Sequence, residues 1–439
     1  MISSRQRLRR QPLRGLGIVA ALLVAAACTP DPPVEPAHPV WTPTVVGWSA
    51  VPGAEAEVPL AATTEDWFVA IEQRPGIGTA ATSSTLLIYP RTGVDGAPAA
   101  TPSQTITVPN GVAGLAMSDH VIAVRARNYL AALDQIHLFG LDPATATWSQ
   151  STLVPRGLDN NRITTFVVSD TALVLGDTRT GQAGDGSALV IPLTVSGASI
   201  SWSFSTVVPL SPDAGWQVND RAGFGRTVAV AADWVAISGG SDHVVVYRRD
   251  GASWTPDLTL LRPSWAGTDG RFGKSLALDI AADGRPRLLV GTSGGFTGFG
   301  VPGPGRAELY SAGPSGWSLS QSIMPRPGSA LDGFAVGNAV ALDGDRAVVG
   351  LYWARVPRPD AVLVDDYRLE VWDVGGATPV FEAELSALTA VGGPRPGQSS
   401  SSPASVGLAG SHVVIVGWEG YAGAPSHFSA ISFDRHPAS

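Results

Sequence analysis

Few local motifs in this 439-residue chain could carry catalysis. Residues 291–295 read GTSGG, the Gly-x-Ser-x-Gly pattern of a serine nucleophile elbow. That elbow needs a strand-to-helix turn together with a histidine and a carboxylate, whereas this segment runs into a Gly/Pro-rich stretch. The seven histidines are scattered and include no His-x-x-x-His pair, so nothing local supports a zinc site. Catalytic side chains from distant segments could still meet around a shared channel.

The N-terminal segment holds the single cysteine, Cys28. Five arginines precede an apolar run over residues 16–27, which is too short to cross a bilayer. The run ends in VAAAC, which resembles a bacterial lipobox, with Ala25 where leucine is commonest. We expect residues 1–27 to be a signal peptide, Cys28 to be lipidated, and residues 28–40 to be a Pro-rich tether. The alternative is ordinary secretion, with Cys28 incidental.

The charge balance limits the class of partner. The full chain has a formal net charge of −8. Loss of residues 1–27 would leave 24 basic against 37 acidic residues, a net charge of about −13. Nucleic acids and anionic membrane surfaces need basic patches. We therefore expect no nucleic-acid partner, and membrane contact only through the lipid anchor of an extracytoplasmic protein.

A strand–turn–strand pattern recurs seven times along the chain. The strongest copies begin at residues 223, 271 and 333; the weaker ones begin at residues 57, 111, 162 and 402. A third apolar strand follows each copy, ending near Tyr89, Phe139, Leu193, Tyr247, Tyr310, Trp372 and Phe433. These ends are roughly 50 to 60 residues apart, and a fourth strand follows, often opened by tryptophan: Trp148, Trp202, Trp254 and Trp317. Four short strands per repeat indicate propeller blades.

We therefore predict an all-β fold, a seven-bladed β-propeller with four-stranded antiparallel blades. One blade buries too little surface to be stable alone, so residues 41–439 should form a single domain. Too few residues follow Phe433 for a fourth strand in the last repeat. The strand predicted within residues 41–53 belongs to no repeat, and we expect it to complete the seventh blade and close the ring.

The repeats resemble the FG-GAP repeat of integrin-α-type propellers. The residues that carry the resemblance are Phe224–Ala229 and Phe272–Ala277, with a weaker copy after Phe334. Many FG-GAP repeats bind calcium in the turn between the first two strands. Here only Asp279 and Asp283 match that pattern, while Ala281 and Arg287 replace two oxygen ligands. We therefore expect no cofactor or metal. If the chain does bind calcium, we expect the ion at this degenerate site.

Long loops on one face of a propeller are the expected place for binding. Such loops are predicted at residues 292–306 and 351–367. The second combines an aromatic residue with both signs of charge: Trp353, Arg355, Arg358, Asp360, Asp365 and Asp366. We interpret this segment as a candidate binding surface. The alternative is a solvated insertion without a ligand.

These features favour a surface-anchored, monomeric binding protein, without enzymatic activity, whose ligand is a protein or a cell-envelope glycan. One alternative is an extracytoplasmic hydrolase or lyase acting on polysaccharide or ester. A second is a structural envelope protein. Acidic and histidine side chains at the channel mouth would favour the enzyme. An apolar or glycine-lined channel would favour binding at the loops.

Overall fold

The computed structural model divides the chain into two compact units, residues 1–37 and 38–439. The structure describes residues 39–49, 60–74, 83–92, 96–109, 111–128, 133–154, 163, 165–177, 186–212, 223–240, 242–266, 271–293, 305–324, 337, 339–357, 363–386, 398–421 and 424–436. The predicted signal peptide, Cys28 and most of the tether lie outside these residues. No α-helix occurs among the described residues, and hence none that is long and apolar enough to span a membrane.

The described strands form seven four-stranded antiparallel sheets, numbered here as blades 1 to 7. Blade 1 contains β2 (Ala61–Thr63), β3 (Trp67–Arg74), β4 (Ser83–Pro90) and β5 (Gln104–Pro109). Blade 2 contains β6 (Gly111–Met117), β7 (Val121–Asn128), β8 (Leu133–Asp142) and β9 (Thr147–Val154). Blade 3 contains β10 (Thr165–Val168), β11 (Ala172–Asp177), β12 (Ser187–Pro192) and β15 (Val208–Leu210). A small hairpin of β13 (Thr194–Ser196) and β14 (Ser199–Ser201) precedes β15.

Blades 4 to 6 follow the same order, from inner to outer strand. Blade 4 contains β16 (Val228–Ala231), β17 (Trp234–Gly239), β18 (His243–Asp250) and β19 (Ser253–Leu261). Blade 5 contains β20 (Arg271–Ile280), β21 (Pro286–Ser293), β22 (Arg306–Gly313) and β23 (Gly316–Ile323). Blade 6 contains β24 (Val340–Asp343), β25 (Arg346–Pro357), β26 (Leu363–Asp373) and β27 (Val380–Ser386). Blade 7 contains β28 (Gln398–Ala409), β29 (His412–Tyr421) and β30 (Ala424–His436), with β1 (Val40–Ser49) as its fourth strand.

The blades close into a ring through their inner strands. Each of β2, β6, β10, β16, β20, β24 and β28 contacts the inner strand of the next blade, and β28 contacts β2. The core lies between the blades, because each apolar cluster joins two neighbouring blades. Phe224, for example, is fully buried and belongs to the cluster shared by blades 3 and 4. The predicted β-propeller is confirmed.

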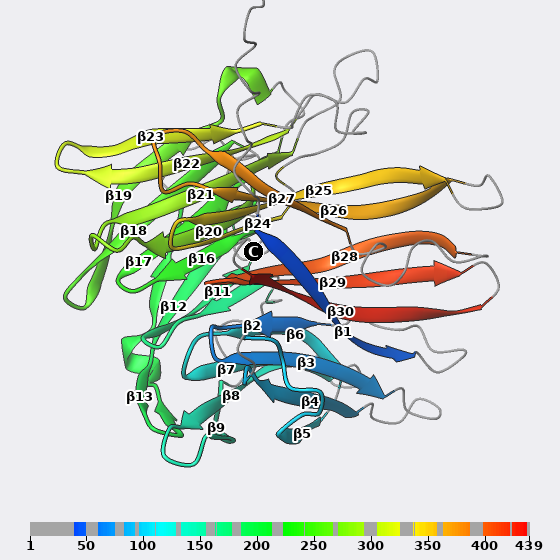
Figure 1. Cartoon of the computed structure of the whole chain (residues 1–439). Coiled ribbons are helices and arrows are strands. Elements are labelled where there is room, and N and C mark those ends of the chain that lie inside the picture. The colour runs from blue at the N-terminus through cyan, green and yellow to red at the C-terminus, as the bar shows by residue number, and fades with distance from the viewer. Residues whose placement is uncertain are drawn as a thin grey trace, which may run out of the picture. The chain divides into compact units, whose positions relative to one another are not determined.

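Strand β1 closes the ring, as predicted. It pairs antiparallel with β30 over its whole length, from Val40 opposite His436 to Ser49 opposite His427. Figure 1 shows β1, at the blue end of the chain, beside the red β30. One blade is therefore built from both ends of the described chain, so that β30 has no free edge.

Two sequence expectations are corrected. Trp202 does not open the fourth strand of blade 3, because the β13–β14 hairpin intervenes and the fourth strand is β15. The predicted loop at residues 351–367 is mostly strand: β25 and β26 continue to pair as far as Pro357 and Leu363. The insertion lengthens the hairpin of blade 6 instead of forming an irregular loop.

Candidate functional site

A cavity of about 510 Å³ lies on the propeller axis, where the inner strands end. All seven blades line it, each with residues from the end of its inner strand or from the turn that follows. Five of the lining residues are acidic: Glu65, Asp119, Asp170, Asp279 and Asp343. No lysine, arginine, histidine or aromatic residue is among its described lining. The ring symmetry thus gathers carboxylates that lie far apart in the sequence.

Two of the five carboxylates have basic partners. Asp170 of blade 3 accepts hydrogen bonds from the Ser118 hydroxyl at 2.6 Å and from the His120 backbone NH at 3.2 Å. Its other oxygen lies 2.7 Å from the Nδ1 atom of His120. Asp279 pairs with Arg287, whose Nη2 atom lies 2.9 Å from its Oδ2 atom. Both residues therefore hold neighbouring segments together as well as lining the cavity.

The other three carboxylates lack such a partner among the described residues. Asp343 accepts a hydrogen bond from the backbone NH of Gly410. Glu65 and Asp119 have no hydrogen bond or ion pair in the described part of the chain. They come from blades 6, 1 and 2, so the uncompensated charge lies on one side of the cavity. This region can attract a cation.

The surroundings of these aspartates change their proton affinity. Asp119 is exposed at the edge of the cavity, but partial desolvation, followed by repulsion from Asp170, raises its pKa. Burial also raises the pKa of Asp279, and the ion pair with Arg287 offsets only part of that effect. Burial acts in the same direction on Asp170, but hydrogen bonds from Ser118 and His120 outweigh it and leave the pKa of Asp170 below its usual value. Asp119 and Asp279 are thus less favoured in their charged forms than an ordinary aspartate.

The two calcium candidates do not converge. Asp279 lines the cavity and binds Arg287, whereas Asp283 lies in the exposed turn and pairs with the Nε atom of Arg285 at 2.9 Å. Arginines thus occupy the places where calcium would need further oxygen ligands. Across the described residues, no group of three His, Cys, Asp or Glu side chains lies close enough to hold a metal ion together.

The candidate binding residues of blade 6 lie elsewhere. Arg355 and Asp365 are opposite each other in the extended hairpin, and Trp353 and Asp366 belong to the same two strands. Arg358 and Asp360 lie outside the described residues. Strand β25 starts at the cavity end of the blade and runs away from it. The hairpin is therefore at the opposite end of blade 6, and binding by these residues stays a prediction.

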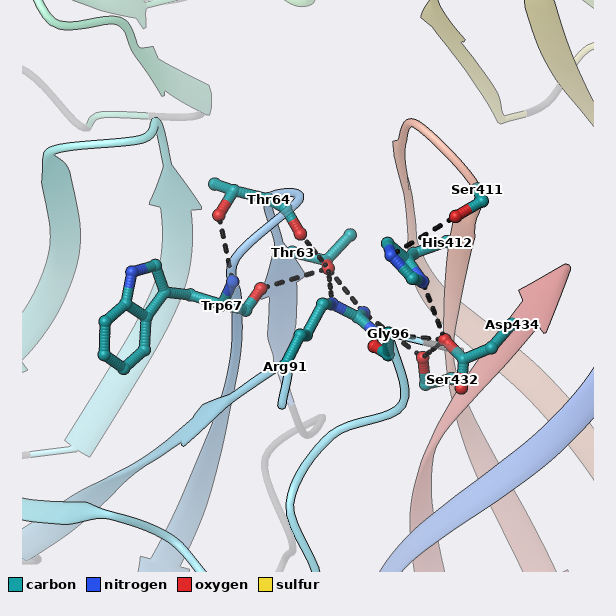
Figure 2. A network of polar contacts seen from close by, with 9 residues as sticks. All are labelled: Thr63, Thr64, Trp67, Arg91, Gly96, Ser411, His412, Ser432 and Asp434. Carbon is teal, nitrogen blue, oxygen red and sulfur yellow. Dashed lines mark hydrogen bonds and ion pairs between the residues drawn. The ribbon is translucent and has the colours of Figure 1, made fainter. Parts of the chain in front are cut away.

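A second polar cluster lies at the junction of blades 1 and 7. Figure 2 shows Arg91 reaching from blade 1 to Ser432 and Asp434 of β30. The Nη1 atom of Arg91 lies 2.9 Å from Asp434, and both side chains are almost fully buried. Burial lowers the pKa of Arg91 to about 10, although Asp434 acts in the opposite direction. This cluster is an ion pair within the protein interior.

The same cluster contains serine, histidine and aspartate in the order of a catalytic triad. The Ser411 hydroxyl lies 3.4 Å from the Nε2 atom of His412, whose Nδ1 atom lies 2.8 Å from Asp434. However, Arg91 already neutralises Asp434. A side chain at Gly96 would collide with the Cε1 and Nε2 atoms of His412, so the backbone there covers the reactive edge of the ring. We therefore assign this cluster a structural role, the joining of blades 1 and 7.

Comparisons with known proteins are consistent with the fold only. No protein-family profile matches the sequence, and no curated protein matches it. The β-propeller domain of the Trilobed protease from Pyrococcus furiosus is similar in structure, with a TM-score of 0.43 and 9% identity over 85% of this chain and 92% of that one. The N-terminal domain of Nup159 has a TM-score of 0.40 and 10% identity over 90% and 96%. YCF48 bound to D1 peptide has a TM-score of 0.39 and 10% identity over 90% and 95%.

Proposed function

We propose that this chain is a binding protein whose axial cavity receives a positively charged side chain of a protein ligand. The observation that carries the proposal is the cavity itself, where Glu65, Asp119 and Asp343 have no basic partner among the described residues. Its volume lies within the range of ordinary ligand sites. The described lining offers no aromatic ring on which a sugar could stack, so a lysine- or arginine-bearing segment fits better than a glycan.

A titration with short peptides tests this function. Penta-arginine should bind the full chain in calorimetry, and penta-alanine should not. Glu65→Gln and Asp119→Asn should each weaken penta-arginine binding roughly tenfold, the loss expected for one charge-assisted hydrogen bond. Asp283→Asn is the matched control, because Asp283 lies in an exposed pair outside the cavity. Equal affinity in the wild type and both cavity variants would refute the proposal.

The acidic lining, with His120 beside Asp170, is what the sequence led us to expect of an enzyme, and it favours a second function, that of a glycoside hydrolase. Neighbouring carboxylates whose pKa values are shifted in opposite directions are typical of acid–base pairs, and Asp119 and Asp170 form such a pair. Hydrogen bonds from Ser118 and His120 occupy both oxygens of Asp170, however, which makes it a poor base or nucleophile. Release of sugar from a polysaccharide panel by the wild type, abolished in Asp119→Asn, would support the enzyme.

The proposed setting is the outer side of a bacterial cell membrane, with a monomeric propeller held by a lipid on Cys28. The arginine-rich start, the short apolar run and VAAAC support this setting. The FG-GAP-like Phe-Gly repeats support it as well, since the integrin-α-type propellers they resemble lie outside the cell. Cys28→Ala should release the protein from the membrane fraction into the soluble fraction, whereas unchanged membrane association would contradict lipidation.

A further inference from the structure

Three cations gather where the inner strands of blades 4 and 5 begin. Arg271 and Lys274 lie at the start of β20, and Arg226 lies just before β16. The Thr227 hydroxyl donates a hydrogen bond to the carbonyl oxygen of Lys274 at 3.1 Å, which joins the two segments. Both inner strands end at the acidic cavity. The cations therefore mark the other end of the propeller axis.

The repeat itself places two of these charges side by side. Phe224–Arg226 and Phe272–Lys274 are equivalent segments of adjacent blades. In each, the phenylalanine is buried between blades and the glycine has a positive φ, 82° at Gly225 and 68° at Gly273. Because the two segments are equivalent in the repeat and both precede the same part of the inner strand, the residue after the glycine lies at a corresponding position in both blades. A cation stands at that position in each of them.

Among the described residues, the three charges have no carboxylate partner. No described carboxylate forms an ion pair with Arg226, Arg271 or Lys274, although the chain is acidic overall. Partial burial, followed by repulsion from Arg226 and Arg271, lowers the pKa of Lys274. Burial and Arg271 likewise lower the pKa of Arg226. A cluster of like charges is unfavourable unless an opposite charge joins it.

We propose that Arg226, Arg271 and Lys274 form a binding site for an oxyanion such as phosphate, free or as part of a larger ligand, at the end of the axis opposite the acidic cavity. Arginine offers a planar fork of donors that matches the oxygens of phosphate, and lysine adds a compact charge. The site is independent of the proposed cation-binding function, since the two involve different residues at opposite ends of the inner strands.

Lys274 is the only lysine of the chain, which provides a selective probe. Reductive methylation with ¹³C-formaldehyde labels this side chain and the N-terminal amine, whose lower pKa of about 8 distinguishes it. In phosphate-free buffer the full chain should give a Lys274 pKa below 10.5. Added inorganic phosphate should shift the signal in a saturable way and raise that pKa, because a bound anion stabilises the charged amine.

Variants at the opposite ends of the axis separate this site from general charge effects. Arg226→Gln should weaken the phosphate response of Lys274 roughly tenfold. Arg285→Gln, in the exposed turn of blade 5 at the acidic end, should leave it unchanged. Phosphate should also raise the melting temperature of the wild type more than that of Arg226→Gln, a measurement that requires no labelling.

A second pair of probes distinguishes a lipid headgroup from free phosphate as the source of the anion. Vesicles of phosphatidylglycerol, with phosphatidylcholine vesicles as control, report binding to a lipid headgroup, and inorganic phosphate reports a free ligand. A response to either probe that is lost in Arg226→Gln supports the site. If the Lys274 signal and the melting temperature respond to neither probe, or respond equally in Arg226→Gln, the proposal is overturned.

Discussion

Asp119 and Asp170 are carboxylates of neighbouring blades with opposite roles in the cavity. Ser118 and His120 bind Asp170, which ties the turn of blade 2 to that of blade 3. Asp119 lies beside them without a hydrogen bond in the described part of the chain, and its pKa is raised. An ionised side chain that opposes folding, at the edge of a cavity, is typical of a binding residue.

Asp119→Asn should therefore raise stability at neutral pH while it weakens binding of cationic peptides. The pKa of Asp119 is higher in the folded than in the unfolded chain, so its ionised form destabilises the fold above that folded pKa. The melting temperature of the variant should exceed that of the wild type at pH 7. The difference should shrink as the pH falls toward 3.8, the ordinary value for aspartate. Calorimetry of both proteins from pH 7 to pH 4, with Asp283→Asn as control, measures the effect; a lower melting temperature at pH 7 would contradict it.

The carboxylates of the cavity were not predictable as a group from the sequence. Each belongs to a different blade, and ring closure alone brings them together. A signal was present, since five of the seven repeats carry an acidic residue in the cavity lining, at the end of the inner strand or in the turn after it. Such residues are also ordinary turn formers. The sequence alone could not separate the two roles.

At the scale of elements, glycines set how closely the blades approach. Gly176 in β11 lies against the carbonyl oxygen of Gly225 in the next blade, and Gly291 in β21 lies against that of Gly337. Gly225 and Gly337 both have a positive φ. At these two junctions the glycine with a positive φ thus makes a close backbone contact with a glycine of the preceding blade.

Gly291→Ala should destabilise the propeller by about 1–3 kcal/mol, the usual cost of overpacking a core. The added methyl group would overlap the carbonyl oxygen of Gly337, which the backbone of blade 6 holds in place. Gly313→Ala in the same blade is the control, because its nearest heavy atom would lie at 3.6 Å. Urea unfolding followed by tryptophan fluorescence compares the two variants; equal midpoints would show that blade 6 can shift to accommodate the methyl group.

The strands were predictable because their signals are local. Alternating apolar residues and turn formers placed the third strand of every blade correctly, including β30 around Phe433. The error at residues 351–367 has a physical cause. Charged residues and prolines resemble a loop in composition, yet the backbones of β25 and β26 continue to pair as far as Pro357 and Leu363, and composition alone does not report such pairing.

At the scale of the whole molecule, the junction of blades 7 and 1 differs from the other six. Its apolar cluster has only five buried members in the described part of the chain, the fewest of the seven. The Arg91 network of Figure 2 bridges the same junction with polar contacts. The described contacts across this junction therefore combine an apolar cluster with hydrogen bonds and an ion pair.

Arg91→Met should lower the free energy of unfolding by about 3–5 kcal/mol, because it removes the arginine that compensates the buried charge of Asp434 and leaves only His412 and Ser432 as partners. Arg262→Met is the matched control: its ion pair with Asp242 also has a length of 2.9 Å but is partly exposed. Its loss should cost less than about 1 kcal/mol. Denaturant titrations of the two variants measure the difference. Similar losses in both would show that the network contributes little to ring closure.

Removal of β1 tests ring closure directly. Deletion of residues 1–49 removes the outer strand of blade 7 and exposes ten residues of β30 as a free edge. An exposed edge pairs readily with another chain, so this variant should melt at a lower temperature and self-associate. Deletion of residues 1–37 retains β1 and should preserve the melting temperature and the oligomeric state of the full chain. Calorimetry and light scattering on both variants distinguish the outcomes: a monomeric 1–49 deletion with an unchanged melting temperature would mean that the other three strands of blade 7 are sufficient to hold the ring closed.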